Sequence, residues 1–344
     1  MRELTGVPLA DRTTLRLGGP ARRLVEVADE AELVDLVRRL DREGEPVLVL
    51  GGGSNLVVAD AGFDGTVVAV GTRGVTVTEE GETARVDLAA GEPWDDAVAW
   101  AVADGLSGVE ALSGIPGSSG ATPIQNVGAY GQEVADVLSG VRVLDRGSGQ
   151  VVDLDPAACG FGYRDSALKR SPGRYLVLTV TLRLSRSAAS QPVRYAELAT
   201  ALGVPVGATA PLGDVRSAVL ELRRSKGMVL DADDPDTVSV GSFFTNPLLS
   251  AAEAAALPAT APRFPQPDGR VKTSAAWLIE HAGFGRGYGH GPVRISGKHT
   301  LALTNRGGAS TEDLLALARE IRTGVRAAYG VELVVEPVLV GCSL

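Results

Sequence analysis

Residues 47–58 read VLVLGGGSNLVV, two short apolar strands joined by Gly51-Gly52-Gly53-Ser54-Asn55. Three consecutive glycines let the backbone turn sharply and approach a ligand closely, and successive N–H groups can form a nest for an anion. The run is not a dinucleotide fingerprint, because it lacks the GxGxxG spacing, and it is not a P-loop, because no Lys-Ser/Thr closes it. Taken alone, the stretch is also compatible with a plain hairpin loop.

Residues 105–131 have neither a helical nor a strand period, and within them a second glycine-rich stretch, residues 115–131, reads IPGSSGATPIQNVGAYG. It lies between well-patterned segments and lacks the charge of a disordered linker, so we expect a functional loop. Small side chains and free backbone donors suit a wall pressed against a flat cofactor and its diphosphate. An ordered loop without a ligand is the alternative, but two such stretches in one half of the chain favour a common ligand.

Hydrophobic patterning around these stretches predicts alternating strands and helices. Asp29 is the expected N-cap of one amphipathic helix, and Ser310 begins a capping-box pattern before a long helix that should end at Gly330. The expected elements are strands at 47–50, 56–58, 66–70, 141–145, 175–184 and 331–340, a hairpin at 75–90, and helices at 29–43, 94–103, 215–222, 274–282 and 310–329.

The 344 residues exceed what one hydrophobic core usually supports, so we expect two or three domains. Hydrophobic residues make up 44% and charged residues 22%, as is ordinary for a globular protein. No apolar stretch is long enough to cross a bilayer, and the N-terminus has no signal-peptide pattern. We therefore expect a cytoplasmic protein with no membrane partner.

Cysteine usage and net charge exclude further classes. The 2 cysteines show no CxxC spacing, which indicates neither a disulfide framework nor a metal site. A net charge of -9 argues against a nucleic-acid partner, because no global basic surface is present to displace counterions. An anionic small ligand, held by a few local cations and N–H groups, stays compatible with this charge.

Three further segments carry candidate side chains. Arg164 lies in FGYRDS, Ser242 lies in GSFFTNP, and Glu336 is an acid in an otherwise apolar closing segment. The alternatives are a surface arginine, a turn serine and a solvated strand face. A carboxylate among apolar residues must face solvent or be paired, and a proline beside Glu336 fits a strand end at a site.

Together these motifs resemble the UDP-N-acetylenolpyruvoylglucosamine reductase family of peptidoglycan precursor synthesis. Each motif alone is only suggestive, whereas the ordered set is highly specific and covers nearly the whole chain. In family order the motifs are the LGG of Leu17–Gly19, GGGSN, the IPG…PIQNVGAYG loop, FGYRDS, GSFFTNP, the WLIE of Trp277–Glu280 and the closing Glu-bearing strand.

The resemblance implies an α+β fold with an FAD-binding half of the vanillyl-alcohol-oxidase (PCMH) type in two lobes, plus a separate α+β substrate-binding domain. The implied first lobe is 1–72, with the C-terminal strand 331–344 packing near the site. The implied second lobe is 73–186 and the substrate-binding domain is 200–325.

It further implies NADPH-dependent reduction of UDP-N-acetylglucosamine enolpyruvate to UDP-N-acetylmuramate through non-covalent FAD, by a monomer. The flavin supplies the redox chemistry and the protein supplies orientation and charge. The implied cofactor-binding residues are Gly51, Gly52, Gly53, Ser54, Asn55, Ile115, Pro116, Gly117, Ser118, Gln125, Asn126, Gly128, Ala129 and Tyr130.

Carried over by position, Arg164, Ser242 and Glu336 match the catalytic trio of the family. The guanidinium of Arg164 and the carboxylic acid of Glu336 would stabilise the negative charge that builds on the substrate, and Ser242 would protonate its C2 carbon.

Four residues match the substrate-binding positions. Tyr195 matches the tyrosine of the subclass that closes a loop over the substrate, Lys226 and Asn246 match positions that hold the diphosphate and sugar, and His299 matches a variable polar contact. The sequence departs from the family at Gly287–Gly291, which looks like extra length, and in placing a valine where some relatives have an arginine after the catalytic glutamate.

Two other readings use the same motifs. A related flavoprotein oxidase would often tether its flavin through histidine, but all 3 histidines lie beyond residue 280, outside the FAD half. Cys159 leaves a cysteinyl link formally open. A nucleotide-sugar binding module without activity is the non-enzymatic alternative, and the retained trio of candidate catalytic residues argues against it.

Overall fold

In the computed structural model, which describes residues 1–344, the apolar runs flanking the triple glycine form β3 (Val47–Leu50) and β4 (Leu56–Val58). These strands do not pair with each other. Strand β3 pairs in parallel with β5 (Phe63–Val70), and β4 pairs in parallel with β19 (Val338–Val340). The alternative of a simple hairpin loop is therefore excluded, and the glycines connect two different sheets.

The chain forms two compact units, each assembled from separated segments. The first unit comprises Met1–Val7, Ala21–Gly53 and Asp64–Val229, and the second comprises Pro8–Pro20, Ser54–Phe63 and Leu230–Leu344. The change from the first to the second unit falls inside the GGGSN motif. These units differ in extent from the three domains expected above, whose boundaries stay a prediction. No helix combines the length and apolar character that crossing a membrane requires.

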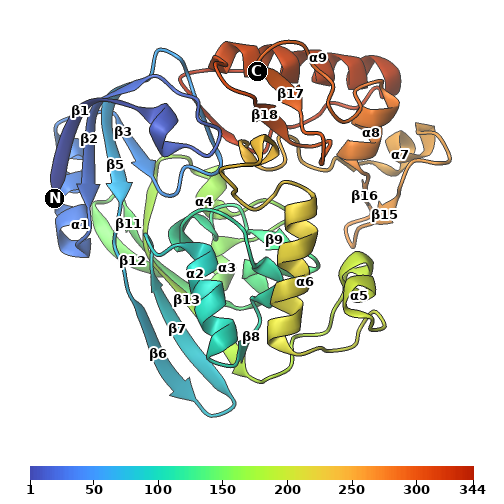
Figure 1. Cartoon of the computed structure of the whole chain (residues 1–344). Coiled ribbons are helices and arrows are strands. Elements are labelled where there is room, and N and C mark those ends of the chain that lie inside the picture. The colour runs from blue at the N-terminus through green and yellow to red at the C-terminus, as the bar shows by residue number, and fades with distance from the viewer. The chain divides into compact units, whose positions relative to one another are not determined.

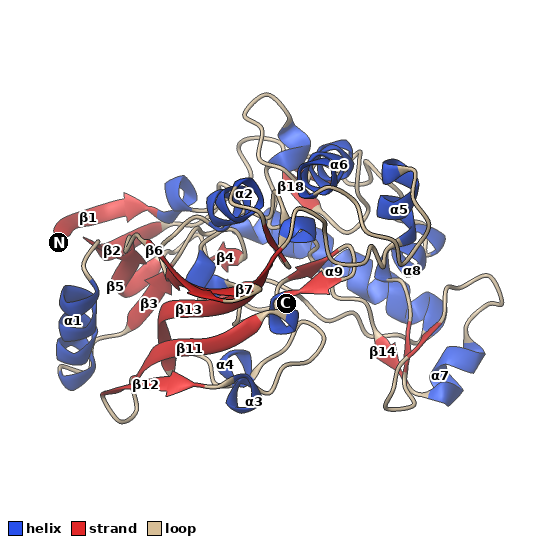
Figure 2. Ribbon diagram, turned by 90° about the horizontal axis from the view of Figure 1, so that it is seen from below, coloured by secondary structure: helices blue, strands red, loops and turns tan.

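The first unit contains two larger sheets and one short two-stranded pair. One has the order β1-β2-β5-β3, and the other has the order β12-β11-β13-β7-β6, with β8 also pairing with β13. Figure 2 shows the long strands of the second sheet running side by side. The bounds are β1 (Arg2–Pro8), β2 (Pro20–Val27), β6 (Val75–Glu80), β7 (Thr83–Ala89), β8 (Leu106–Ser107), β11 (Leu138–Asp145), β12 (Gln150–Leu154) and β13 (Tyr175–Arg186).

Helices and short turns complete this unit. Asp29 caps α1 (Glu30–Arg42) by accepting from the Glu32 N–H at 2.9 Å, as expected. Helix α2 (Trp94–Ala103) buries Trp94 in the core of the larger sheet, and α5 (Ala196–Leu202) lies beside α6 (Leu212–Ser225) (Figure 1). The remaining elements are β9 (Gly128–Ala129), β10 (Gln132–Glu133), α3 (Pro156–Cys159), α4 (Ala167–Arg170) and 3-10 turns at Glu110–Leu112, Ser119–Ala121 and Val134–Asp136.

The second unit packs α8 and α9 around one apolar core with short strand pairs. The expected capping box at Ser310 is confirmed, and α9 ends at Gly330 in the left-handed conformation with φ of 68°. The bounds are β14 (Leu248–Leu249), β15 (Phe264–Pro265), β16 (Val271–Lys272), β17 (Val293–Ile295), β18 (Leu303–Asn305), α7 (Ala251–Ala256), α8 (Ala275–His281), α9 (Thr311–Tyr329) and 3-10 turns at Leu9–Arg12 and Pro235–Thr237.

The expected terminal strand 331–340 is wrong over most of its length, because only β19 at its end is a strand. The preceding residues alternate between buried and exposed, which explains the prediction, but they reach a ladder only through an isolated bridge between Val335 and Phe244. Pro337 has no N–H to donate, so it interrupts pairing immediately before β19. This interruption places Glu336 between two short paired segments.

Candidate functional site

The two glycine-rich stretches of the first unit lie against each other. A Cβ atom added at Gly52 would lie 2.6 Å from the Gly117 Cα atom. Two non-bonded carbon atoms do not approach this closely, so only glycine fits at position 52. At Gly51 an added Cβ would collide with the Ser118 hydroxyl. Both glycines at 51 and 52 are exposed. The stretches that looked alike in sequence thus form one backbone-lined cradle, which we call the glycine cradle (Gly51, Gly52, Gly117 and Ser118).

Polar atoms in the adjoining loop are buried without a partner. The Ser119 hydroxyl and the Gln125 Oε1 atom make no hydrogen bond within the protein. Leaving a buried polar group unpaired costs roughly 1–3 kcal/mol, which a ligand with its own polar edge would offset. Gln125 was among the expected cofactor-binding residues, whereas Ser119 was missed beside the expected Ser118. Both serines are buried, and the unpartnered hydroxyl of Ser119 distinguishes it from its neighbour.

Left-handed backbone concentrates in the same region. Of the four non-glycine residues with positive φ in the chain, three are Asn126 at 46°, Tyr130 at 50° and Arg164 at 53°. Such a conformation costs free energy for residues with a Cβ, and it persists where surrounding contacts impose it, often at ligand sites. The loop and the FGYRDS turn are therefore held in a shape that their own residues disfavour.

Arg164 is held against the loop by its guanidinium. Its Nη2 atom donates to the Gly128 carbonyl at 2.7 Å, and the Lys169 ammonium donates to the Arg164 carbonyl at 2.9 Å. Asn126 joins the same two segments, since its Nδ2 atom donates to the Gly162 carbonyl at 3.1 Å and to Glu133 at 2.8 Å. Asn126, expected to bind cofactor, thus uses its amide to shape the loop.

A cluster of aromatic and charged side chains surrounds Tyr130. Its ring meets that of Tyr195 edge to face at 5.6 Å, and the Lys226 ammonium lies 5.5 Å from the Tyr130 ring centre. Lys226 also forms an ion pair with Glu197 at 2.5 Å. Burial raises the pKa of Tyr130 to about 12, so its hydroxyl stays protonated at neutral pH.

Arg223 is a further member of this cluster that the sequence motifs did not indicate. It lies in α6 one turn before Lys226, and burial lowers its pKa to about 10. Its Nη2 atom donates to the Met228 carbonyl at 2.8 Å, while its Nε atom is buried without a partner. Tyr195 and Lys226, which were expected at the substrate, are therefore brought together with Arg223 and Glu197.

Asp95 of α2 supports both the loop and α6. One carboxylate accepts from the Gly114 N–H at 2.6 Å, directly before the loop, and from Arg216 of α6 at 2.6 Å. Burial raises the pKa of Asp95, but the hydrogen bonds from Arg216 and Gly114 outweigh burial and bring the pKa below its ordinary value.

Replacing Asp95 by asparagine is therefore expected to lower stability at neutral pH but not in acid. A carboxyl whose pKa is depressed in the folded state contributes stability above its unfolded pKa of about 3.9, and this contribution is lost as pH falls through the lower folded pKa. Urea unfolding from pH 7 to pH 3 should show the two proteins converging below about pH 4. Asp96→Asn, at an exposed neighbouring carboxylate, is the control and should show little pH-dependent difference; a constant gap for Asp95→Asn would contradict the prediction.

In the second unit, Ser242 and Glu336 lie on neighbouring backbone segments. Ser242 bridges to Ala302, and the next residue, Phe243, donates its N–H to the Leu301 carbonyl at 2.7 Å. On its other side Phe243 accepts from the Glu336 N–H at 2.9 Å. Ser242 and Glu336 lie far apart in sequence, and the backbone hydrogen bond between Glu336 and Phe243, the residue after Ser242, brings their segments together.

Asn55 of the GGGSN motif reaches the same place through β4. Its carbonyl accepts from the Val338 N–H at 3.0 Å, and its Nδ2 atom donates to the Glu336 carbonyl at 3.5 Å. The parallel pairing of β4 with β19 therefore places the last residue of the motif beside the closing acid. Asn246, by contrast, uses its Oδ1 atom to accept from the Ala275 N–H at 2.9 Å at the start of α8.

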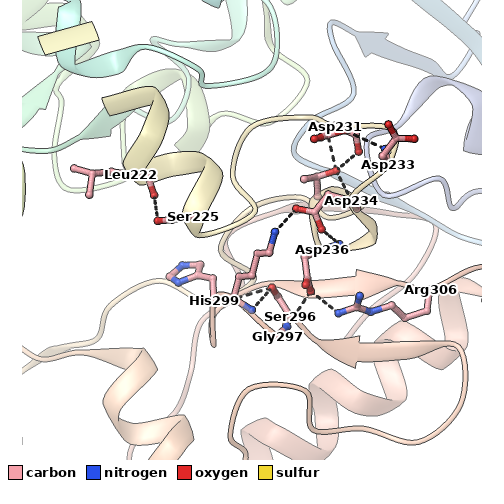
Figure 3. Close-up of polar contacts among 12 residues, drawn as sticks. Leu222, Ser225, Asp231, Asp233, Asp234, Asp236, Ser296, Gly297, His299 and Arg306 are labelled. Atoms are coloured by element: carbon pink, nitrogen blue, oxygen red, sulfur yellow. Dashed lines mark hydrogen bonds and ion pairs between the residues drawn. The ribbon is translucent and has the colours of Figure 1, made fainter. Parts of the chain in front are cut away.

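His299 lies in the turn between β17 and β18, which two aspartates secure (Figure 3). Asp236 accepts from the Gly297 N–H at 2.9 Å and pairs with Arg306, while Asp234 pairs with Lys298 at 2.6 Å. The same turn ends at the segment that pairs with Ser242. The two aspartates therefore fix the backbone on which both His299 and the partner of Ser242 lie.

Known proteins share both parts of this chain. Residues 234–340 match the profile of the UDP-N-acetylenolpyruvoylglucosamine reductase C-terminal domain, and residues 21–155 match an FAD-binding domain. The chain is 59% identical to the UDP-N-acetylenolpyruvoylglucosamine reductase of Thermobifida fusca, over 98% of each chain. The chain belongs to the UDP-N-acetylenolpyruvoylglucosamine reductase family. The family enzyme of Streptomyces coelicolor is 56% identical over 100% of this chain and 92% of its own.

A solved structure of the reductase from Thermus caldophilus agrees in fold, with a TM-score of 0.68 and 28% identity over 98% of each chain. The expected α+β fold with an FAD-binding domain and a C-terminal reductase domain is confirmed. The chain is thus an FAD-dependent oxidoreductase of this reductase family, which sets aside both the oxidase and the inactive binding module.

The residues of the first unit fit FAD. The glycine cradle has exposed backbone at Gly51 and Gly52, where a side chain would collide with the facing segment. The Ser119 hydroxyl and the Gln125 Oε1 atom are buried without a hydrogen-bond partner in the protein and could bind polar groups of a ligand. A cysteinyl link to the flavin does not fit, because Cys159 is fully buried and burial raises the pKa of its thiol to about 11. Of the three residues expected to be catalytic, Arg164 belongs to the first unit, and Ser242 and Glu336 belong to the second.

Proposed function

We propose that the chain reduces UDP-N-acetylglucosamine enolpyruvate to UDP-N-acetylmuramate with NADPH, as a cytoplasmic monomer in peptidoglycan precursor synthesis. Family membership supports this reaction, and the observation that carries the assignment of residues is the pairing of Phe243 with Glu336. That pairing holds a hydroxyl and a carboxyl group on adjacent segments, as addition of a proton to a charged intermediate requires.

FAD, when bound, would supply the hydride-transfer chemistry between NADPH and the substrate, which side chains cannot supply. We assign Gly51, Gly52, Gly117, Ser119 and Gln125 to holding it. Close approach of the glycine backbone leaves N–H groups available to a diphosphate, and the two orphaned side-chain atoms are available to polar ring edges. The expected roles of Ser54, Asn55 and the rest of the loop are part of the same proposal.

Arg164 and Glu336 are assigned to the charge that develops when the enolpyruvyl group is reduced at C3. Negative charge then spreads over C2 and the substrate carboxylate. Arg164 is a permanent cation whose orientation is set by the Gly128 carbonyl before any substrate arrives. A preorganised cation of this kind stabilises developing charge without reorganising during the reaction.

Ser242 is assigned as the proton donor to C2. A serine hydroxyl is a weak acid, but an enolate-like carbon is basic enough to take its proton. Gly241, with φ of 74°, lets the chain turn immediately before Ser242, and the bridge to Ala302 fixes the backbone on its other side. The hydroxyl therefore projects from a backbone whose position is defined by the second unit alone.

Substrate recognition is assigned to Tyr195, Lys226, Asn246 and His299. The contact between Tyr195 and Tyr130 supports membership of the subclass whose tyrosine closes over the substrate, because it places the exposed ring beside the loop. Lys226 is assigned to the diphosphate, and NADPH is proposed to leave the site before the UDP-sugar enters.

Anaerobic stopped-flow absorption tests this function. NADPH should bleach the flavin of the purified yellow protein, and the UDP-linked enolpyruvyl sugar should restore its colour. A protein whose reduced flavin is reoxidised by oxygen but not by this sugar would refute the proposed substrate.

A further inference from the structure

The proposed reaction assigns no role to the ion pair between Glu197 and Lys226. It joins α5 to α6 at 2.5 Å, and its side chains are 41% and 30% exposed. Lys226 is the residue assigned above to a diphosphate, and its ammonium is paired with the Glu197 carboxylate. Tyr130 lies against the same ammonium, at 5.5 Å.

A second cation, the guanidinium of Arg223, lies in the same cluster around Tyr130. Arg223 is buried nearby, and burial lowers its pKa to about 10, because water has been removed from the guanidinium. Its one hydrogen bond described here goes to a backbone carbonyl, and its Nε atom has no partner. A buried cation is costly, and it lowers the cost of bringing an anion close. The Asp95 carboxylate acts on Arg223, whereas Glu197 is the carboxylate that pairs with Lys226.

We propose that Glu197 stands in for the ligand diphosphate, pairing with Lys226 in the empty protein and yielding to the diphosphate when a nucleotide binds. The inference rests on the proposed function, since it takes Lys226 as a diphosphate ligand. Glu197 and the diphosphate carry the same sign of charge and need the same ammonium, so they compete. Glu197 therefore weakens nucleotide binding, and its removal strengthens it.

The position of Glu197 in α5 gives this competition a structural consequence. Tyr195 is the N-cap residue of α5, and Glu197 lies in the first turn of the same helix. Tyr195 contacts Tyr130 from this helix end, and the ion pair to α6 holds the helix in that place. Exchange of Glu197 for a diphosphate removes the ion pair between α5 and α6 and leaves the apolar packing of the two helices, so binding of the anion and placement of Tyr195 are coupled.

Glu197→Gln in the FAD-loaded protein tests the proposal, because it keeps the shape of the side chain and removes its charge. Titration calorimetry with UDP should give a Kd about two- to fivefold lower than that of the unchanged protein, the range expected for a partly exposed ion pair. The gain should shrink as salt is added, since salt screens the competing carboxylate. Glu221→Gln, an exposed acid on α6, is the matched control and should leave the Kd unchanged.

A double-mutant cycle identifies the route of the effect. Lys226→Met should weaken UDP binding, and adding Glu197→Gln to it should change nothing further, because the ammonium for which the two anions compete is gone. Weaker or unchanged UDP binding in Glu197→Gln alone would overturn the inference while leaving the Lys226 assignment intact. If Lys226→Met binds UDP normally, the assignment of Lys226 fails and the inference fails with it.

Discussion

Replacement of Ser242 by alanine is expected to leave flavin reduction by NADPH unchanged and to slow reduction of the enolpyruvyl sugar by a factor of about 10² to 10⁴. The first half-reaction needs no proton at the substrate carbon, whereas the second ends with one. The backbone around Ser242 is held by its bridge to Ala302 and by the N–H bond of Phe243, neither of which needs the hydroxyl. The substitution should therefore remove the proton donor without moving its surroundings.

Anaerobic stopped-flow separates the two half-reactions in this variant. Ser343→Ala is a control in the same unit, since that serine is exposed and only its carbonyl is used, by Arg319. It should match the unchanged protein in both steps. Survival of both half-reactions in Ser242→Ala would show that another group delivers the proton, and loss of both would point to a disturbed flavin site.

Replacement of Gly52 by alanine is expected to weaken FAD binding severely. The new methyl group would lie 2.6 Å from the Gly117 Cα atom, so the two sides of the glycine cradle must separate. Because the obstacle is backbone, no side-chain rotation relieves it. Overpacking of this kind costs about 1–3 kcal/mol, which corresponds to roughly a five- to hundredfold loss of affinity. The ratio of flavin to protein absorbance in the purified protein, and titration of the apoprotein with FAD, would measure it.

Two further glycines calibrate that result. Gly51→Ala meets a serine hydroxyl rather than backbone, so it should weaken FAD binding less than Gly52→Ala. Gly213→Ala lies in α6 with nothing within 4 Å of the added carbon, and alanine there should keep FAD and stabilise the helix by about 1 kcal/mol. Equal FAD content in Gly52→Ala and Gly213→Ala would show that the cradle does not hold the cofactor.

Local signals in the sequence were reliable wherever the physics is local. The helix expected at 94–103 has those bounds in the structure, and Asp29 and Ser310 are the N-cap residues of their helices, as expected. At each helix start the side-chain oxygen accepts a backbone N–H, from Glu32 at Asp29 and from Asp313 at Ser310. These elements follow from hydrophobic period and from oxygen atoms placed at a helix start. The expected strand at 331–337 was wrong because alternation reports which side is buried, and it does not reveal whether a neighbouring strand is available to pair.

The family resemblance indicated the candidate catalytic residues, but it did not indicate three residues that the structure places near the proposed binding sites. Arg223 and Ser119 carry no motif of their own, and they stand out only because burial leaves a polar atom of each without a partner. Glu197 is likewise an ordinary helix acid in sequence. Its ion pair with Lys226 depends on the packing of α5 against α6, which cannot be predicted from residue spacing along the chain.

By itself, the sequence determined the family and the cofactor class, because a set of motifs in family order is specific to one family. The catalytic side chains it indicates stay a prediction. Tertiary structure alone decided which segments meet. Ser242 and Glu336 are neighbours because Phe243 bonds to both flanking segments, and the triple glycine is a cradle wall because Gly117 lies against it. Such contacts depend on long-range packing between segments that are distant in sequence. At Gly52, the close approach of the Gly117 backbone excludes every side chain larger than hydrogen.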